Sequence, residues 1–553
     1  MSLSTVKILV ASDIHAGYGE LKQPNIRNDS FEAFREVLKY GIEHEVDFVL
    51  LGGDLFHENN PSRETQLEVV RSIRKYCFNN KDVPIEFVSD PSVNFQHSSF
   101  STVNYEDPNI NVGMPIFTIH GNHDDLSGKG LTSLDLLHEA GLVNLFGKFN
   151  DVDKIEVSPI LLRKRETKIA LYGISSQRDD RLCRAFMQEN VKFLRPTDDP
   201  DSWFNILVLH QNRPRRSTSR TTGSYLPVKY IPAFMDLVIW GHEHESIIEP
   251  QYFAPNDSGD GFYIIQPGST VATSLSKEET VPKHCAIISV REDRKFQSKP
   301  IRLATPRQIF VEELILDNPP RKLPKTTVRQ PNMLDEEIIS KKIEEILTEA
   351  KNSRGPRQPP LPLVRLKVVY SGAWLNIPPI NGRKFGMRYS DRVANPLDMI
   401  SVRTIRPEKP RDDLDGPISD RAKEECANID DMINKYFSTC DIKHKMDVLT
   451  DALMTRSLKE YANVDTTYVA ADKMFLQSVK NQINVMTDKL KSLDDFAAEN
   501  VDEEKLEKDI LKAIHVMKKA RAIPAVNGAQ NGAGDAQVNL NLVKNENDDE
   551  MID

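Results

Sequence analysis

The sequence predicts an α/β sandwich, built by one large domain that occupies about the first 300 residues. Short apolar runs of four to eight residues, rich in Val and Ile, recur through this region. Helix-like spacings of apolar residues lie between them. Because the runs are apolar on both faces, they are typical of strands in a sheet covered on both sides, and their alternation with helices is typical of a layered α/β domain.

Most of the predicted strands end at a polar or ionisable residue. In order they are VKILVAS before Asp13, VDFVLLGG before Asp54, PIFTI before His120, KIALYG, NILVL before His210 and DLVIWG before His242. Apolar residues three and four apart predict two amphipathic helices between the strands. They run through Phe31, Phe34, Val37 and Leu38, and through Leu67, Val70, Ile73 and Cys77.

Composition changes along the chain predict further units. The large domain is expected at residues 1–300, interrupted by a polar and aromatic loop insertion at 84–114. Loops of this length inside a compact domain are usually functional. A smaller α+β domain follows, because a helix over Leu334–Ala350 precedes the alternating strand VRLKVVY. This domain is expected at residues 301–410. The later segments are expected to be a linker at 411–427, amphipathic helices with one apolar face at 428–490 and a disordered acidic tail at 522–553.

The composition excludes several classes of protein. Hydrophobic residues make up 39% and charged residues 28%, which is ordinary for a soluble globular chain. No stretch approaches the ~20 consecutive apolar residues that a spanning helix needs, and the N-terminus lacks the pattern of a secretory signal, so we expect no membrane association. Five scattered cysteines without a CxxC pair predict neither disulfides nor a thiolate zinc site, and favour a cytosolic or nuclear compartment.

The net charge conceals an asymmetry. Lys and Arg number 72 and Asp and Glu 82, so the net charge is 72 − 82 = −10. Residues 351–410 nevertheless carry twelve basic and three acidic residues, 12 − 3 = +9. Residues 529–553 carry one Lys and six acids, 1 − 6 = −5. This division predicts a basic working surface and an acidic tail.

Hard oxygen and imidazole donors follow five of the predicted strands. The motifs are Asp13-Ile14-His15, Gly53-Asp54, Gly121-Asn122-His123-Asp124, His210, and Gly241-His242-Glu243-His244. Strand ends of this kind meet at one edge of an α/β sheet. Buried carboxylates would repel one another there without a cation, so the set predicts a pair of divalent metals, and the absence of thiolate suits Mn, Fe or Zn.

The spacing within these motifs predicts their geometry. Residues two apart on an extended strand end point to the same face, so Asp13 and His15 should reach one metal centre, as should His242 and His244. Asp54 stands alone after its strand, and one carboxylate can bridge two metals ~3.5–4 Å apart. The neighbouring glycines, Gly52, Gly53, Gly121 and Gly241, should let the chain turn sharply into the cleft.

The order DxH, GD, GNHD, H, GHxH resembles the calcineurin-like metallophosphoesterase superfamily, which hydrolyses phosphate esters with two metals and a metal-activated hydroxide. Five segments, GGDLFHENNPSR, HQNR, WGHEHE, QPGSTVATSL and DRVANPLD, are further similar to the meiotic recombination eleven family of double-strand-break repair nucleases, of eukaryotic type. The resemblance covers about four-fifths of the chain. It implies two β-sheets flanked by helices, followed by a capping domain that holds DNA.

The same resemblance implies an activity and partners. The activity is that of a Mn-dependent nuclease, with 3′–5′ exonuclease action on duplex ends and endonuclease action on single strands. Two Mn²⁺ ions per subunit, a homodimer and a nuclear location are implied. So are a coiled-coil ABC-type ATPase partner and a regulatory subunit of the Nijmegen breakage type.

Residue roles are also carried over from the resemblance. One metal is implied at Asp13, His15, Asp54 and His244, and the other at Asp54, Asn122, His210 and His242. His123 would protonate the leaving oxygen or stabilise the phosphate, and His57 would help position the DNA phosphate. Asp124 is inferred to orient His123, from its adjacency alone.

Two alternatives remain at this point: a small-molecule metallophosphodiesterase or phosphatase, and a non-catalytic scaffold on the same fold. The complete ligand set disfavours the scaffold. Basic residues disfavour a small substrate, because a basic flank suits a polyanionic duplex. These expected DNA-binding residues are Arg213, Arg215 and Arg216, just after His210, and Arg383, Lys384 and Arg388 in the basic stretch.

Three surfaces are expected to bind proteins. The helix with Leu67, Val70 and Ile73 is implied to form the dimer, the alternative being packing on its own sheet. The 84–114 insertion, with Phe95, Phe100 and Tyr105, is implied to hold the Nijmegen-type subunit, the alternative being a disordered loop. The helices at 428–490 are expected to bind the ATPase, rather than form an autonomous bundle, through Met432, Ile433, Tyr436, Phe437 and Leu453.

Overall fold

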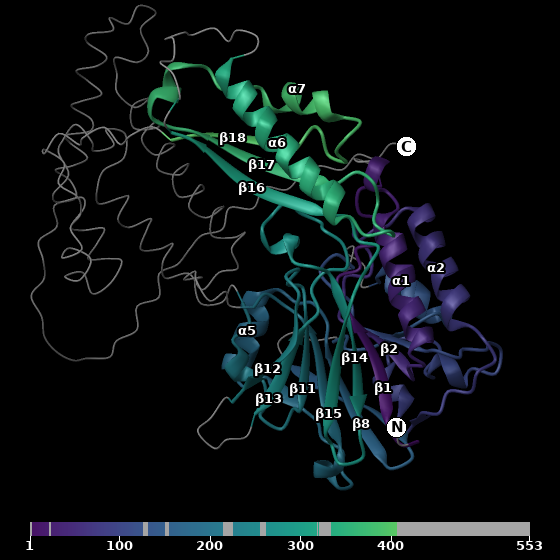
Figure 1. Ribbon diagram of the computed structural model, residues 1–553. Coiled ribbons are helices and arrows are strands. Elements are labelled where there is room, and N and C mark those ends of the chain that lie inside the picture. The colour runs from purple at the N-terminus through teal and green to yellow at the C-terminus, as the bar shows by residue number, and fades with distance from the viewer. Residues whose placement is uncertain are drawn as a thin grey trace, which may run out of the picture. The chain divides into compact units, whose positions relative to one another are not determined.

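The structure is a computed structural model (Figure 1). It describes residues 3–20, 24–124, 131–149, 154–213, 225–254, 261–317, 319 and 333–405. Every described residue belongs to one compact unit, residues 1–407. The predicted linker, the helices at 428–490 and the acidic tail lie outside the described residues.

Two sheets form the large domain. The first has six strands, in the order β15-β14-β1-β2-β4-β5. Strands β1, β2, β4 and β5 are mutually parallel, and β14 and β15 continue the sheet antiparallel. Their bounds are β1 (Val6–Ala11), β2 (Phe48–Leu51), β4 (Ile116–Thr118), β5 (Asn144–Leu145), β14 (His284–Val290) and β15 (Phe296–Arg302).

The second sheet has seven strands, in the order β12-β13-β11-β10-β8-β7-β3. Its centre, β8, β10, β11 and β13, is parallel, while β12, β7 and β3 are antiparallel to their neighbours. The bounds are β3 (Glu86–Phe87), β7 (Ile160–Lys164), β8 (Thr167–Ile174), β10 (Phe204–His210), β11 (Leu237–Gly241), β12 (Ile247–Phe253) and β13 (Phe262–Gln266). A separate parallel pair joins β6 (Ile155–Val157) to β9 (Val191–Phe193).

Apolar side chains fill the space between the two sheets and cover their outer faces. Ile8, Leu50, Val208 and Ile239, which alternate with outward-facing residues along their strands, belong to the layer between the sheets. The outer face of the first sheet is covered by α1 (Asp29–Glu43) and α2 (Arg63–Cys77), which lie side by side in Figure 1, with α4 (Ser133–Glu139) in the same core. On the second sheet, α5 (Asp179–Met187) contributes to the outer layer. The predicted two-sided burial of the strands is therefore confirmed.

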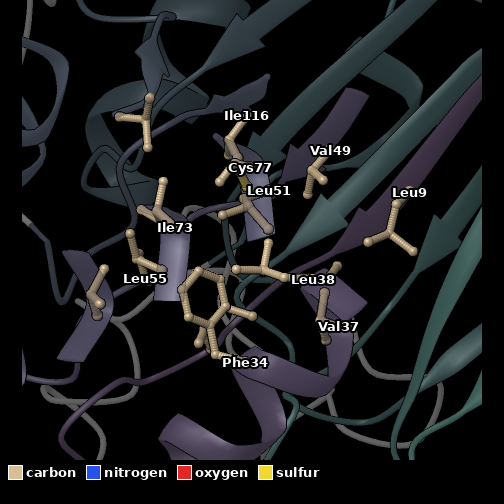
Figure 2. Close-up of a cluster of buried hydrophobic side chains, with 14 of the residues drawn as sticks. Leu9, Phe34, Val37, Leu38, Val49, Leu51, Leu55, Ile73, Cys77 and Ile116 are labelled. Carbon is tan, nitrogen blue, oxygen red and sulfur yellow. The ribbon is translucent and has the colours of Figure 1, made fainter. Parts of the chain in front are cut away.

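The buried stripe of α2 differs from the expected one. Val69, Ile73 and Cys77 pack in the core, and Figure 2 shows Ile73 and Cys77 in the cluster with Leu51 and Ile116 of the sheet. By contrast, Leu67 is 45% exposed. The expectation of one stripe through Leu67, Val70, Ile73 and Cys77 is wrong, because the helix turns Leu67 away from the sheet that buries Ile73.

The 84–114 segment is packed against the large domain. The expected loop insertion contains the short strand β3, one helical turn, α3 (Pro91–Asn94), and one 3-10 turn (Asn104–Glu106). Phe95 and Val103 are buried between the sheets, and Tyr105 packs against the same core. Phe100 is 58% exposed. Of the three aromatic residues expected on a partner surface, only Phe100 is therefore presented to solvent.

The smaller domain has a three-stranded parallel sheet in the order β16-β17-β18. Its strands are β16 (Ile309–Leu316), β17 (Leu363–Tyr370) and β18 (Ile400–Thr404), and its helices are α6 (Leu334–Ser353) and α7 (Gly382–Gly386). Ile339, Ile343 and Ile346 of α6 bury one face against the sheet, as their spacing of three and four predicts.

Two carboxylates of α1 tie the smaller domain to the larger. The buried carboxylate of Glu36 accepts hydrogen bonds from Thr305 N at 2.8 Å and from Arg357 Nη2 at 2.6 Å. Asp29 accepts from Arg307 Nε at 2.6 Å. Charge-assisted bonds of this kind are stronger than neutral ones, so they fix the connecting segments on the helix.

Candidate metal centre and active site

The predicted donor residues converge at one edge of the two sheets. Asp13 and His15 follow β1, Asp54 follows β2, and Asn122 follows β4 in the six-stranded sheet. His210 ends β10, while His242 and His244 follow β11 in the seven-stranded sheet. The site is thus formed where the carboxyl ends of parallel strands from both sheets meet.

The spacing argument assumed an extended backbone at this site, but the backbone there is not extended. Asp13, His15, Asp54 and His242 all have positive φ, between 48° and 80°. Such left-handed conformations are uncommon for non-glycine residues and concentrate at functional sites. The expectation that residues two apart share a face of an extended strand end is wrong here, because the strands have already ended in tight turns. Asp13 and His15 do join one donor group, but His242 and His244 join different ones, so the prediction that they reach one metal centre is wrong.

Asp13, His15 and His244 form the first donor group. His15 Nε2 lies 3.1 Å from His244 Nε2, and Asp13 Oδ1 lies 3.9 and 3.8 Å from these two nitrogens. The other oxygen of Asp13 accepts hydrogen bonds from Ser12 Oγ and from His242 N. Two imidazole nitrogens and one carboxylate oxygen therefore face a common point.

Asp54, His210 and His242 form the second donor group. The amide oxygen of Asn122 joins them, at 3.1 Å from His210 Nε2 and 2.7 Å from His242 Nδ1. His210 Nδ1 donates to the Gly52 carbonyl at 2.8 Å, which leaves Nε2 as the nitrogen that faces the group.

The carboxylate of Asp54 belongs to both groups. Its Oδ2 lies 3.3 Å from His210 Nε2 and 3.8 Å from His15 Nε2. Asp54 Oδ2 and Asp13 Oδ1 are buried oxygens without a hydrogen-bond partner. Orphaned buried oxygens are costly unless a cation satisfies them, so the residues present fit two divalent ions that share Asp54. Carboxylate, amide and imidazole donors without thiolate suit Mn, Fe or Zn.

The pKa values of the donor residues indicate which proton a metal ion must displace. Burial opposes charge on both Asp54 and His210, but their mutual attraction lowers the pKa of Asp54 and raises the pKa of His210 to about 10. Burial together with the neighbouring His210 lowers the pKa of His242 to about 3. A proton on His210 balances Asp54 in the absence of metal, so metal binding must displace it and will be favoured by higher pH.

Two further histidines stand beside the donor groups. The rings of His57 and His123 are stacked with centroids 5.1 Å apart, and His123 meets His15 edge to face at 4.9 Å. Together His15, His57 and His123 form a third group whose nitrogens lie close enough for a metal. Unlike the other two groups it contains no carboxylate, and it shares His15 with the first donor group.

His123 is oriented by the backbone of His57. Its Nδ1 lies 2.6 Å from the His57 carbonyl oxygen, to which it donates, so Nε2 remains available to a substrate. The expectation that Asp124 orients His123 is wrong. Asp124 accepts from the backbone amides of Leu55, Phe56 and Gly121 at 2.9–3.1 Å, so it fixes the Asp54 turn instead. Burial and the nearby Asp54 raise the pKa of Asp124 to about 7.

One glycine shows why the turns cannot carry side chains. A Cβ added to Gly121 would lie 1.9 Å from Asp54 Oδ1 and 2.4 Å from Asp54 N. Only glycine lets the strand carrying Asn122 approach the Asp54 turn this closely.

The basic residues expected to bind DNA are placed differently from one another. Arg213 is held by Gln266 and Gln251, both at 3.1 Å, and lies over the Trp240 ring. Arg215 and Arg216 lie outside the described residues. Arg383, Lys384 and Arg388 are exposed on and just after α7, although Arg388 also pairs with Glu336 at 2.9 Å. Of the described residues that were expected to bind DNA, those exposed to solvent therefore belong to the smaller domain.

Sequence reasoning missed several residues at the site. Ser12 binds Asp13, and Glu279, Thr273 and Lys283 form a polar cluster against His244. The motif QPGSTVATSL could have indicated that this segment belongs to the site. Spacing alone does not reveal that Glu279 contacts His244, which lies 35 residues away in the chain.

Comparison with known proteins agrees with this geometry. Residues 6–246 match the family described as calcineurin-like phosphoesterase, and residues 296–461 match the Mre11 DNA-binding presumed domain. The fold and site therefore define a metallophosphoesterase, an enzyme of the phosphodiesterase and nuclease type whose fold implies a dinuclear metal site. The second match extends beyond the described residues.

Relatives identify the family. The double-strand break repair protein mre-11 of Caenorhabditis elegans is 50% identical over 506 residues, which cover 88% of this chain and 69% of that protein. MRE11 of Gallus gallus is 41% identical over 491 residues, covering 86% and 67%, and MRE11 of Homo sapiens is 40% identical over 509 residues, covering 90% and 69%. The chain belongs to the Mre11 family of double-strand break repair nucleases, which confirms the resemblance drawn from the motifs. Among the described residues, no helix is both long and apolar enough to cross a membrane.

Proposed function

We propose that this protein is a Mn²⁺-dependent DNA nuclease of a double-strand-break repair complex. It would act as a 3′–5′ exonuclease on duplex ends and as an endonuclease on single strands. The observation that carries the proposal is the carboxylate of Asp54, whose buried Oδ2 lies between two separate donor groups. A bridging carboxylate at that position is what a two-metal phosphodiesterase requires.

The two metal positions follow from the donor atoms. Asp13, His15, Asp54 and His244 would hold one ion, and Asp54, Asn122, His210 and His242 would hold the other. The bound pair would supply a water of lowered pKa and Lewis-acid stabilisation of the phosphoryl oxygens. Mn²⁺ is the proposed ion at both positions, since the mixture of carboxylate, amide and imidazole ligands suits it.

His123 and His57 would act on the substrate itself. His123 Nδ1–H is fixed by the His57 carbonyl, so its Nε2 is the atom that would give a proton to the leaving sugar oxygen. The imidazole of His57, stacked on His123, would contact the scissile phosphate and hold it in register. Both rings are half-buried, so a substrate can reach them.

DNA would be held across the large and the smaller domain. We take the nuclease domain as residues 1–300 and the DNA-capping domain as 301–410. Arg383 and Lys384 are exposed on α7 and would contact phosphates, with Arg388 partly neutralised by Glu336. Arg213 would support the wall of the site beside His242 rather than contact DNA, because its guanidinium is already bound by two glutamines.

Partner binding is proposed on three surfaces. Leu67, with the half-buried Val70, would contribute to a homodimer through α2, while Ile73 supports that helix from the core. The exposed Phe100 marks the part of the 84–114 segment that would hold a Nijmegen-type subunit. The 428–490 region would bind the coiled-coil ATPase. A nuclear location follows from this role.

A cleavage assay tests the proposal. The purified full chain is incubated with a blunt duplex in Mn²⁺, in Mg²⁺ or in EDTA. A 5′-labelled strand should shorten progressively in Mn²⁺ only, while a 3′-labelled strand should release labelled mononucleotide at once. Cleavage that persists in EDTA, or that appears only with small phosphate esters, would contradict the assignment.

A further inference from the structure

The QPGSTVATSL motif and the turn after it lie against the first donor group. Gly268 has a φ of +75°, and a Cβ there would lie 2.7 Å from Ser246 N. Ser269 N donates to the His244 carbonyl at 3.2 Å, and Thr270 N donates to the Asp13 carbonyl at 3.1 Å. The segment that joins β13 to β14 therefore fastens two metal-binding turns that come from different sheets.

Glu279 brings a buried carboxylate to this segment. Its side chain is 1% exposed, and its Oε1 lies 2.9 Å from His244 Nδ1. The same oxygen accepts from Thr273 N at 3.1 Å and Thr273 Oγ1 at 3.2 Å. Its Oε2 accepts from Ser269 Oγ at 3.2 Å and from the buried ammonium of Lys283. Both oxygens are thus held in place by several donors.

This arrangement determines which nitrogen of His244 faces the metal position. A carboxylate only accepts hydrogen bonds, so Nδ1 carries the hydrogen on the side of Glu279. The hydroxyl of Thr273, whose Oγ1 lies 2.8 Å from the same nitrogen, can accept from it as well. The lone pair is then on Nε2, which points to His15 Nε2 at 3.1 Å and to Asp13 Oδ1 at 3.8 Å. His210 is oriented by a backbone carbonyl instead, at 2.8 Å from Gly52 O. The two proposed metal positions are therefore supported by different means.

We infer that Glu279 is a positioning residue for one metal position, the one formed by Asp13, His15 and His244. It fixes the tautomer and the ring orientation of His244, and Lys283 holds Glu279 in the required place. Loss of the group that hydrogen-bonds the other ring nitrogen of a metal-binding histidine commonly lowers metal affinity 10–100-fold. Loss of Glu279 therefore weakens this position and spares the position of His210 and His242. The inference rests on the proposed two-metal function.

The test is a calorimetric titration of Mn²⁺ into metal-stripped full-length protein. Glu279→Leu is combined with Lys283→Met, so that no buried ammonium is left unpaired. Glu279→Gln with Lys283→Met is the rescue variant, because an amide oxygen can still accept from Nδ1. Glu245→Gln is the matched control, since it removes an exposed carboxylate one residue from His244.

We expect the wild type and the control to bind two ions. The Leu variant should bind one ion normally and the other about 10–100-fold more weakly. The Gln variant should recover part of that loss. Electron paramagnetic resonance at one Mn²⁺ equivalent per site should show a coupled pair in the wild type and mainly isolated Mn²⁺ in the Leu variant.

The possible failures are distinguishable. A wild type that binds fewer than two ions overturns the proposed function, and this inference with it. If the wild type binds two ions and the Leu variant binds both equally well, only the role of Glu279 is wrong. A melting temperature of the metal-free Leu variant well below that of the metal-free control, with both ions weakened alike, would show a merely structural role and also overturn the inference.

Discussion

Replacement of His123 by asparagine separates metal binding from leaving-group protonation. His123 lies outside the two donor groups that share Asp54. What links it to Asp54 is its backbone N–H, which donates to Asp54 Oδ1 at 2.8 Å and is retained in any variant. Both metals should therefore remain bound to His123→Asn. The imidazole that could protonate the leaving oxygen is lost.

The size of the effect depends on the leaving group. A general acid contributes about 10²–10⁴-fold, which corresponds to roughly 3–5 kcal/mol of activation free energy. DNA cleavage should slow by that factor, because a sugar alkoxide leaves poorly without a proton. Hydrolysis of bis(p-nitrophenyl) phosphate should slow far less, because nitrophenolate leaves without protonation.

The assay compares both substrates in single-turnover experiments with saturating Mn²⁺. His57→Ala serves as a second variant, since the His57 backbone carbonyl that orients His123 remains. It should impair DNA cleavage without the leaving-group dependence. Equal slowing of both substrates by His123→Asn would refute protonation and favour phosphate stabilisation, and wild-type rates on DNA would remove His123 from the mechanism.

Three further predictions concern metals, DNA and the dimer. Asp54→Ala should lose both ions and all cleavage, because one oxygen serves two donor groups, and elemental analysis showing two bound ions would exclude the bridge. Arg383→Glu with Lys384→Glu should reduce the slope of log affinity against log salt by about 0.9 per lost phosphate contact, with small-ester hydrolysis unchanged; an unaltered slope would place α7 away from DNA. Leu67→Asp should convert a dimer to a folded monomer in sedimentation, whereas Ile73→Asp should unfold the chain because that side chain is fully buried, so a stable Leu67→Asp dimer would move the interface elsewhere.

Much of this molecule could be predicted from local pattern. Strands such as β1 and β10 are recognisable because apolar residues on both faces have few other places to lie than inside a covered sheet. The donor residues were found because each motif lies at the end of its own strand, and strands of parallel sheets end at a common edge. The order of the motifs was sufficient to indicate the family.

Other features depend on contacts between residues far apart in the chain. Periodicity placed Leu67 and Ile73 on one stripe, but the position of the sheet decided that Ile73 is buried and Leu67 is not. Adjacency suggested that Asp124 orients His123, yet its carboxylate accepts from two backbone amides that follow Asp54 and from the backbone amide of Gly121. Glu279 reaches His244 only because the segment after β13 crosses from one sheet to the other. Sequence determines which side chains can bury or ionise, but the partner of a buried charge is decided by the tertiary fold, because a desolvated carboxylate is stable only beside the donors that the surrounding chain brings to it.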